Sequence, residues 1–236
     1  MKKLTRAQKR KLRYFAVVVG VASLVSLLAI LLVVGIAHLF KDGSKETKEV
    51  MAYDFSSINV AKPAISEMFL TKNVNSRPGT ALNKINGIVI HYTANPGTDA
   101  EANRNYFDSR KDFPDEAGYK VSSHFIVGLD GTIVQCIPEN EIAYASNDRN
   151  SDTISIECCH PKKNGKYTKK TYQALIHLAA YLCDKYEIEP EKIIRHYDVT
   201  GKICPRYYVK HPDAWEKLKS DVDVYLKKSL KKTKAE

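Results

Sequence analysis

Short apolar runs rich in β-branched residues recur along the chain from residue 85 onward. Runs of this length that are bounded by polar or turn-forming residues are typical of buried β-strands. One region has two such runs on either side of Asp130-Gly131, a pair favoured in tight hairpin turns. The pattern therefore predicts strands within residues 85–93, 123–138, 153–159 and 193–197, with a hairpin inside the second region.

Three further segments carry the spacing of helices. In residues 171–187 apolar side chains recur every three or four positions and form one stripe, while residues 100–111 show a weaker helical pattern. Asp213 and Glu216 have the spacing of a capping box, which predicts a last helix that runs toward Lys228. Because strands and helices alternate without internal repeats, we expect a single α/β domain with a central mixed β-sheet flanked by helices.

The N-terminal region has a different pattern. Residues 14–40 contain no Asp, Glu, Lys or Arg, and a helix of this length crosses the hydrocarbon core of a bilayer. Residues 1–13 carry seven basic residues and no acidic one, so the positive-inside rule places them in the cytoplasm. The alternative is a signal peptide cleaved near Gly35 and Ala37, but the apolar run is longer than an ordinary signal sequence. We therefore predict a single-pass membrane helix at 14–40, with the rest of the chain outside the cell.

Composition and charge refine this division. Residues 41–67 are polar and lack periodicity, which predicts an extracellular linker before a domain at 68–236 that ends in a basic helix. The net charge is +10, but residues 1–50 hold ten Lys/Arg and only three acidic residues. Residues 51–236 are therefore only weakly basic, which argues against nucleic-acid binding.

Two histidines fall at the ends of predicted strands. His91 follows the run GIVI, His196 follows IIR, and Cys204 comes eight residues after His196. Two imidazoles and a thiolate can form a three-ligand zinc site with a fourth position open for water. A single histidine at a strand end is more often an ordinary core or surface residue, so the spacing alone leaves both interpretations open.

Four motifs carry a family resemblance: GIVIHYTANPGT, SSHFIVGLDG, TISIECCHP and RHYDVTGKICPRYY. In this order and spacing, they resemble the zinc-dependent N-acetylmuramoyl-L-alanine amidases of the type 2 family. That family shares its fold with peptidoglycan recognition proteins and phage amidase endolysins. The resemblance extends over residues 68–215 and implies an enzyme that acts on peptidoglycan of the cell wall.

The resemblance also implies roles for individual residues. It places the zinc ligands at His91, His196 and Cys204, a catalytic glutamate at Glu157 and a catalytic lysine at Lys202. The implied reaction is hydrolysis of the amide bond between N-acetylmuramic acid and L-alanine, with a zinc-bound water as nucleophile. Glu157 acts as the general base and Lys202 stabilises the developing negative charge. Since strand residues alternate, we expect Glu157 and its sequence neighbours to face opposite layers.

Other residues near these motifs are assigned to the cleft or to the fold. Some family members use a tyrosine at the position of Ser123, so the general-base role falls to Glu157 alone. His124 is expected to line the cleft or to support the sheet, because a fourth protein ligand would leave no place for water. The loop residues expected to contact substrate, together with His124, are Tyr92, Thr93, Asn95, Tyr144, Ser146 and Asn147. The histidines expected not to bind metal are His160, His177 and His211.

The cysteines other than Cys204 lie within apolar runs, which favours free thiols over a disulfide although three pairings are possible. These residues are Cys136, Cys158, Cys159 and Cys183.

Three other functions remain open. A catalytically silent peptidoglycan-binding receptor on the same fold is the main alternative, although such relatives commonly lack the metal ligands. Cytosolic recycling of muropeptides conflicts with the predicted anchor. A phage-derived lytic enzyme is expected to be soluble rather than tethered.

Overall fold

The computed structural model describes Arg6, Arg10 and residues 53–114 and 119–230. The predicted membrane helix at 14–40 lies outside the described residues. Within the described residues, no helix has the length and apolar character needed to cross a bilayer. The described residues from Tyr53 onward belong to one compact unit.

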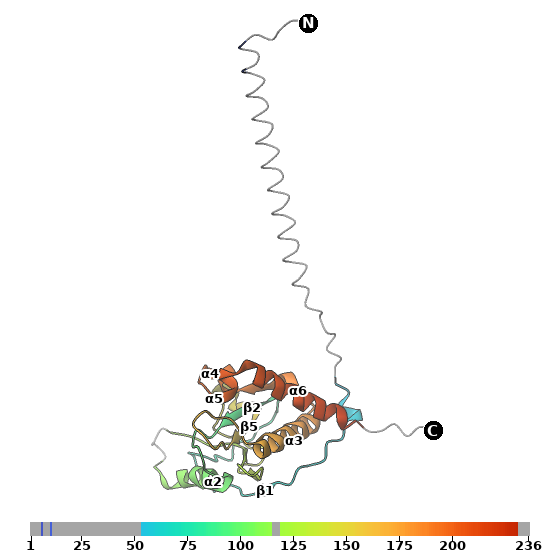
Figure 1. Cartoon of the computed structure of the whole chain (residues 1–236). Coiled ribbons are helices and arrows are strands. Elements are labelled where there is room, and N and C mark those ends of the chain that lie inside the picture. The colour runs from blue at the N-terminus through green and yellow to red at the C-terminus, as the bar shows by residue number, and fades with distance from the viewer. Residues whose placement is uncertain (1–5, 7–9, 11–52, 115–118, 231–236) are drawn as a thin grey trace, which may run out of the picture. The chain divides into compact units, whose positions relative to one another are not determined.

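A six-stranded sheet forms the centre of this unit (Figure 1). Its strands are β1 (Ser66–Glu67), β2 (Gly87–Tyr92), β3 (Phe125–Val127), β4 (Ile133–Gln135), β5 (Thr153–Cys158) and β6 (Ile193–Arg195). The order across the sheet is β1-β4-β3-β5-β2-β6. Among the described strand pairs of this sheet, only the β3–β4 hairpin is antiparallel, and Gly131 in its turn has a φ of 90°. The predicted mixed α/β fold is therefore confirmed.

Helices occupy the segments between and after the strands. The α-helices from Tyr53 onward are α2 (Ala100–Asp108), α3 (Lys169–Tyr186), α4 (His196–Thr200), α5 (Arg206–Lys210) and α6 (Pro212–Lys228). The 3₁₀ turns are η1 (Phe55–Ser57), η2 (Ser109–Asp112), η3 (Asn147–Ser151) and η4 (Pro190–Lys192). The helix predicted at 100–111 ends as the 3₁₀ turn η2, while α4 and α5 were not predicted because each is too short to show a period.

The two faces of the sheet are covered by different helices. Ile90 of β2 and Ile156 of β5 pack in one apolar cluster with Leu178 of α3 and Leu218 of α6. On the opposite face, Ile126 of β3 packs in a second cluster with α2. Because side chains alternate along a strand, the residues that neighbour Ile90 and Ile156 point toward the α2 side.

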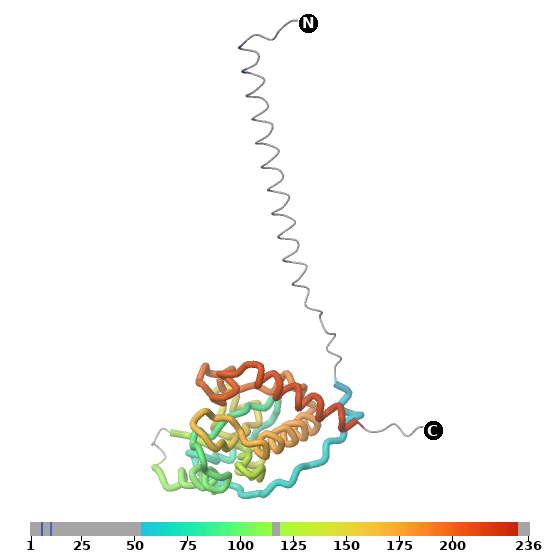
Figure 2. Tube along the Cα trace, in the orientation of Figure 1, coloured from blue at the N-terminus to red at the C-terminus, as the bar shows by residue number. Residues whose placement is uncertain are grey.

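The folded unit begins earlier in the chain than predicted. Residues 53–67 were expected to be linker, but residues 53–61 lie beside α3 and the C-terminal end of α6, and residues 66–67 form β1 in the sheet (Figure 2). Val60 is buried, and its backbone N–H donates to the Asp184 carboxylate of α3 at 2.7 Å. The Asn59 N–H donates to the Ser229 carbonyl at 3.0 Å. The buried apolar residues of this segment, Ile58 and Val60, are too few to form a periodic pattern that the sequence would reveal.

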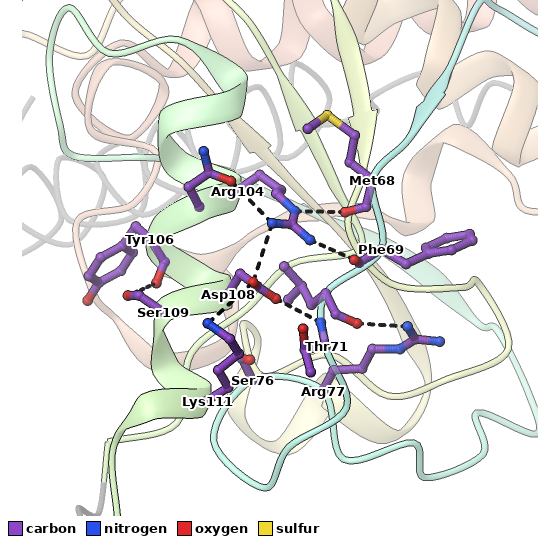
Figure 3. A network of polar contacts seen from close by, with 12 residues as sticks. Met68, Phe69, Thr71, Ser76, Arg77, Arg104, Tyr106, Asp108, Ser109 and Lys111 are labelled. Atoms are coloured by element: carbon purple, nitrogen blue, oxygen red, sulfur yellow. Dashed lines mark hydrogen bonds and ion pairs between the residues drawn. The ribbon is translucent and has the colours of Figure 1, made fainter.

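A polar network fastens the segment after β1 to α2 (Figure 3). The Arg104 guanidinium donates to the carbonyl oxygens of Met68 at 2.9 Å and Phe69 at 2.7 Å. The Asp108 carboxylate accepts from the Thr71 backbone N–H at 2.7 Å. Because these contacts satisfy backbone groups outside the sheet, they fix α2 relative to the edge of the sheet.

Two predicted details are wrong. Asp213 does not cap α6, because the helix starts one residue earlier at Pro212 and its N-cap is His211. Proline suits the first helical position because its missing N–H has no partner there in any case. His196 does not end a strand, since β6 stops at Arg195 and His196 is the first residue of α4.

Candidate metal and catalytic site

Parallel pairing in the middle of the sheet gathers the predicted site residues. β2 pairs with β5 so that His91 lies opposite Glu157, and with β6 so that Ile90 lies opposite Arg195. Paired residues of neighbouring strands have side chains on the same face, so His91 and Glu157 both point toward the α2 side. His196 follows Arg195 directly, so it also lies at the carboxyl end of β2.

A tight loop brings Cys204 back to the carboxyl end of β2, beside His91 and His196. α4 makes little more than one turn and stops at Gly201, whose φ of 76° suits a residue without a side chain. The Tyr197 backbone N–H donates to the Cys204 carbonyl at 2.8 Å, which ties the end of the loop to the start of α4. The eight-residue separation of His196 and Cys204 thus becomes spatial proximity.

The three predicted metal ligands form one buried cluster. His91, His196 and Cys204 each offer a donor atom, and these atoms lie within 4.8 Å of one another. The Cys204 Sγ is 3.8 Å from the His91 Nδ1, and the two imidazole centroids are 4.7 Å apart. No other group of three such side chains that could hold a metal ion occurs among the described residues.

The remaining ring nitrogens have partners in the loop before β5. The His91 Nε2 lies 3.2 Å from the Ser146 Oγ, and the His196 Nε2 lies 3.0 Å from the Asn147 Oδ1. Both imidazoles are thus held at Nε2, on the side of the ring away from the Nδ1 that approaches Cys204 in His91.

Burial sets the protonation of the cluster. Burial, with the charges of His196 and Lys202, holds the pKa of His91 well below its usual range, and burial with Lys202 also lowers the pKa of His196. Both rings are therefore neutral near pH 7, the form that binds a metal ion. Burial, together with the negative charge of Glu157, raises the pKa of Cys204 to about 12.

This donor set fits zinc. Two neutral imidazoles and one sulfur match the ligand types of tetrahedral zinc sites, and three protein ligands leave one position for a reactant. A bound divalent cation deprotonates a coordinated thiol, so the neutral thiol of the metal-free site does not oppose the assignment.

Glu157 lies beside this cluster in an unusual environment. Its Oε2 is buried and has no hydrogen-bond partner among the described residues. Burial raises the pKa of Glu157 to about 7, and the positive charge of Lys202 acts in the opposite direction. A carboxyl group with a pKa near 7 can both accept and return a proton at neutral pH.

A cleft of about 790 Å³ opens over these groups. Its lining includes the three candidate ligands together with Glu157 and Lys202. A candidate metal position, a carboxyl group with a raised pKa and a lysine therefore border one cavity, an arrangement that suits metal-assisted hydrolysis.

Comparison with known proteins agrees with this geometry. The N-acetylmuramoyl-L-alanine amidase family matches residues 81–207, which is more than half of the chain. The chain belongs to this family. The predicted resemblance to N-acetylmuramoyl-L-alanine amidases is confirmed.

Individual relatives show how far the similarity reaches. N-acetylmuramoyl-L-alanine amidase CwlL of Bacillus licheniformis is 36% identical over 184 residues, which cover 70% of this chain and 48% of that protein. The catalytic domain of XlyA is 28% identical with a TM-score of 0.56, over 68% of this chain and 99% of that structure. N-acetylmuramoyl-L-alanine amidase LysC of Clostridium intestinale URNW is 25% identical with a TM-score of 0.54, over 69% of this chain and 99% of that structure. The chain spans just under half the length of the curated relatives it matches.

The lining of the cleft includes most of the residues predicted to contact substrate, and two of them lie elsewhere. The residues found in its lining are Tyr92, Thr93, Asn95, Tyr144 and Asn147. Ser146 is buried behind the cleft against His91. His124 is also buried, with Nε2 against the Glu141 carbonyl at 2.9 Å and Nδ1 accepting from the Ser155 N–H at 3.0 Å. Because both nitrogens of His124 are occupied by the sheet and a loop, its ring supports the fold rather than the cleft.

The sequence did not reveal one face of α2 and one tyrosine as parts of the site. One side of the cleft includes Asn103, Tyr106 and Phe107 of α2, whose spacing places them on one helix face. That spacing is visible in the sequence, but it does not distinguish a cleft wall from a core. Tyr167 was also missed. Its buried hydroxyl donates to the His91 carbonyl at 2.8 Å and holds the end of β2 in place. No local sequence signal indicates this long-range contact.

Proposed function

We propose that this chain is a zinc-dependent N-acetylmuramoyl-L-alanine amidase that hydrolyses the bond between N-acetylmuramic acid and L-alanine in peptidoglycan. The observation that carries the proposal is the cluster of His91, His196 and Cys204, with donor atoms within 4.8 Å of one another, in a cleft that also contains Glu157. Family membership supports the choice of substrate.

His91, His196 and Cys204 would hold the zinc ion. Bound zinc supplies Lewis acidity, which makes a water molecule acidic and an amide carbonyl electrophilic. Glu157 removes a proton from the attacking water and later donates it to the departing nitrogen of L-alanine. Lys202 places a positive charge where the carbonyl oxygen becomes negative.

The main alternative is a receptor that binds peptidoglycan without cleaving it. A receptor needs neither a metal site nor an acid–base group, and here the ligands and Glu157 are present together. The complete set of groups favours the enzyme.

We also propose that the domain faces the outside of the cell on a single-pass membrane anchor. Support comes from the sequence alone, namely the uncharged run at 14–40 after the basic residues of 1–13. External protease added to intact protoplasts should remove the domain, and protection of the domain would contradict this orientation.

The activity is tested with the full-length chain, zinc and purified sacculi. Wild type should release stem peptides that begin with L-alanine, as identified by mass spectrometry. Cys204→Ala should lose zinc and activity together, whereas Glu157→Gln should keep zinc and lose activity. Binding of wild type to sacculi without release of peptides, at any zinc concentration, would instead support the receptor.

A further inference from the structure

The loop before β5 reaches both candidate histidine ligands with two consecutive side chains. The Ser146 Oγ lies 3.2 Å from the His91 Nε2, and the Asn147 Oδ1 lies 3.0 Å from the His196 Nε2. We propose that Ser146 and Asn147 are positioning residues that orient the two imidazoles for zinc, rather than substrate contacts. This inference rests on the proposed function only in taking zinc as the ion.

The hydrogen bonds indicate which ring nitrogen carries the proton and which is free to bind a metal ion. A neutral imidazole carries one N–H, and the Oδ1 of an asparagine can only accept a hydrogen bond. Asn147 therefore keeps the proton of His196 on Nε2 and leaves the Nδ1 lone pair free. The Ser146 hydroxyl can accept or donate, and when it accepts from the His91 Nε2–H it frees the Nδ1 that lies 3.8 Å from the Cys204 Sγ. Metal-binding histidines are commonly fixed in this way, through the nitrogen that does not bind the metal.

The loop is built to hold these two side chains in place. The Asn150 Oδ1 accepts from the backbone N–H groups of Ala145 at 3.0 Å and Ser146 at 2.6 Å. Asn147 has a φ of 52°, in the left-handed region that non-glycine residues rarely occupy and that asparagine tolerates better than most. Ser146 is buried and Asn147 is exposed at the cleft, so substitution of Asn147 removes no core packing.

The unusual backbone of Asn147 allows a matched pair of variants. Asn147→Gly keeps the left-handed conformation available and removes the acceptor, while Asn147→Asp tolerates the same conformation and keeps an acceptor oxygen. Ser146→Ala tests the contact to His91 in the same way. The measurement is the zinc Kd of the full-length chain at neutral pH, obtained by competition with a chromophoric chelator. Thermal unfolding of each metal-free variant checks that the fold is kept.

We expect Asn147→Gly and Ser146→Ala each to weaken zinc binding by about 10- to 100-fold, the usual effect of losing such a contact. Asn147→Asp should bind zinc at least as tightly as wild type. The inference is overturned if Asn147→Gly keeps the wild-type zinc Kd, including the case in which it loses only hydrolysis, since that result identifies a substrate contact. It is also overturned if wild type binds no zinc.

The inference and the proposed function can fail separately. If wild type binds zinc and Asn147→Gly weakens that binding, the positioning role stands even when sacculi are not cleaved. If sacculi are cleaved but the zinc Kd is the same in wild type and Asn147→Gly, the amidase stands and the positioning role falls.

Discussion

Glu157 should destabilise the metal-free protein, and removal of its charge should reverse this effect in a pH-dependent way. Burial raises the pKa of Glu157 from its ordinary value of 4.5 to about 7. Below about pH 4.5 the carboxyl group is protonated in the folded and unfolded states, so its ionisation does not lower the free energy of unfolding. Above about pH 7 it is ionised in both states, and the folded state carries the whole cost of the buried charge. Stability is therefore lost as the pH rises between these two values.

The size of this stability loss follows from the difference between the pKa of Glu157 in the folded protein and its ordinary value. A difference of one in pKa corresponds to about 1.4 kcal/mol, so the cost at about pH 8 is about 3 kcal/mol. Glu157→Gln is uncharged at every pH and should avoid this cost. The stability of the variant relative to wild type should therefore rise by about 3 kcal/mol between about pH 4 and pH 8. In a domain of this size, that corresponds to a relative increase in Tm of about 6–12 °C.

The assay is denaturant unfolding of the chelator-treated full-length chain, followed by circular dichroism across this pH range. Glu67→Gln is the control, because Glu67 is an exposed carboxylate on the edge strand β1. A relative stability of Glu157→Gln that does not change with pH would refute the reasoning, because it would mean that the Glu157 carboxyl ionises at its ordinary pKa.

Three further outcomes are expected. Cys204→Ala should reduce zinc affinity by orders of magnitude, measured by chelator competition, because two imidazoles alone make a poor tetrahedral site. Lys202→Met should keep zinc but lower the rate of sacculus hydrolysis by about 10²-fold, because the proposed reaction loses the charge assigned to stabilising the oxyanion. It should also raise the pH at which activity appears, since Lys202 lowers the pKa of Glu157. Leu178→Ala, in the core under the sheet, should lower the free energy of unfolding by about 2–5 kcal/mol and leave the zinc Kd unchanged.

Much of the fold was predictable because its central strands are short and fully buried. The run GIVI and the hairpin around Asp130-Gly131 stand out in the sequence, and both are found where predicted. The long stripe of α3 has a clear helical period, and the helix runs from Lys169 to Tyr186. These elements are specified by local patterns, which a single sequence contains.

The features that escaped prediction depend on contacts between distant segments. Val60 lies in a polar stretch and becomes buried only because α3 and α6 are beside it. His124 looked like a site residue, yet hydrogen bonds to Ser155 and Glu141 use both of its nitrogens. Ser146 and Asn147 were identified as site residues, but their partners became visible only once the loop and the two histidines were placed together.

The candidate ligands combine a local pattern that was visible in the sequence with a spatial arrangement that was not. From spacing alone, His91, His196 and Cys204 left an ordinary structural role open, and the family resemblance was needed to prefer zinc. Parallel pairing of β2 with β6 brings His91 and His196 together, and the loop after α4 brings Cys204 to them. Neither the strand pairing nor the path of this loop can be deduced from the local sequence of one element.

The most direct test of the central claim is to identify which bond in purified sacculi the zinc-loaded full-length chain breaks. An amidase exposes one new free amino group on L-alanine for each bond cut and creates no new reducing sugar end. We predict that N-terminal labelling will detect alanine at a rate that falls to background in Glu157→Gln, with no gain in reducing ends. New reducing ends, or new amino groups on any residue other than alanine, would contradict the account.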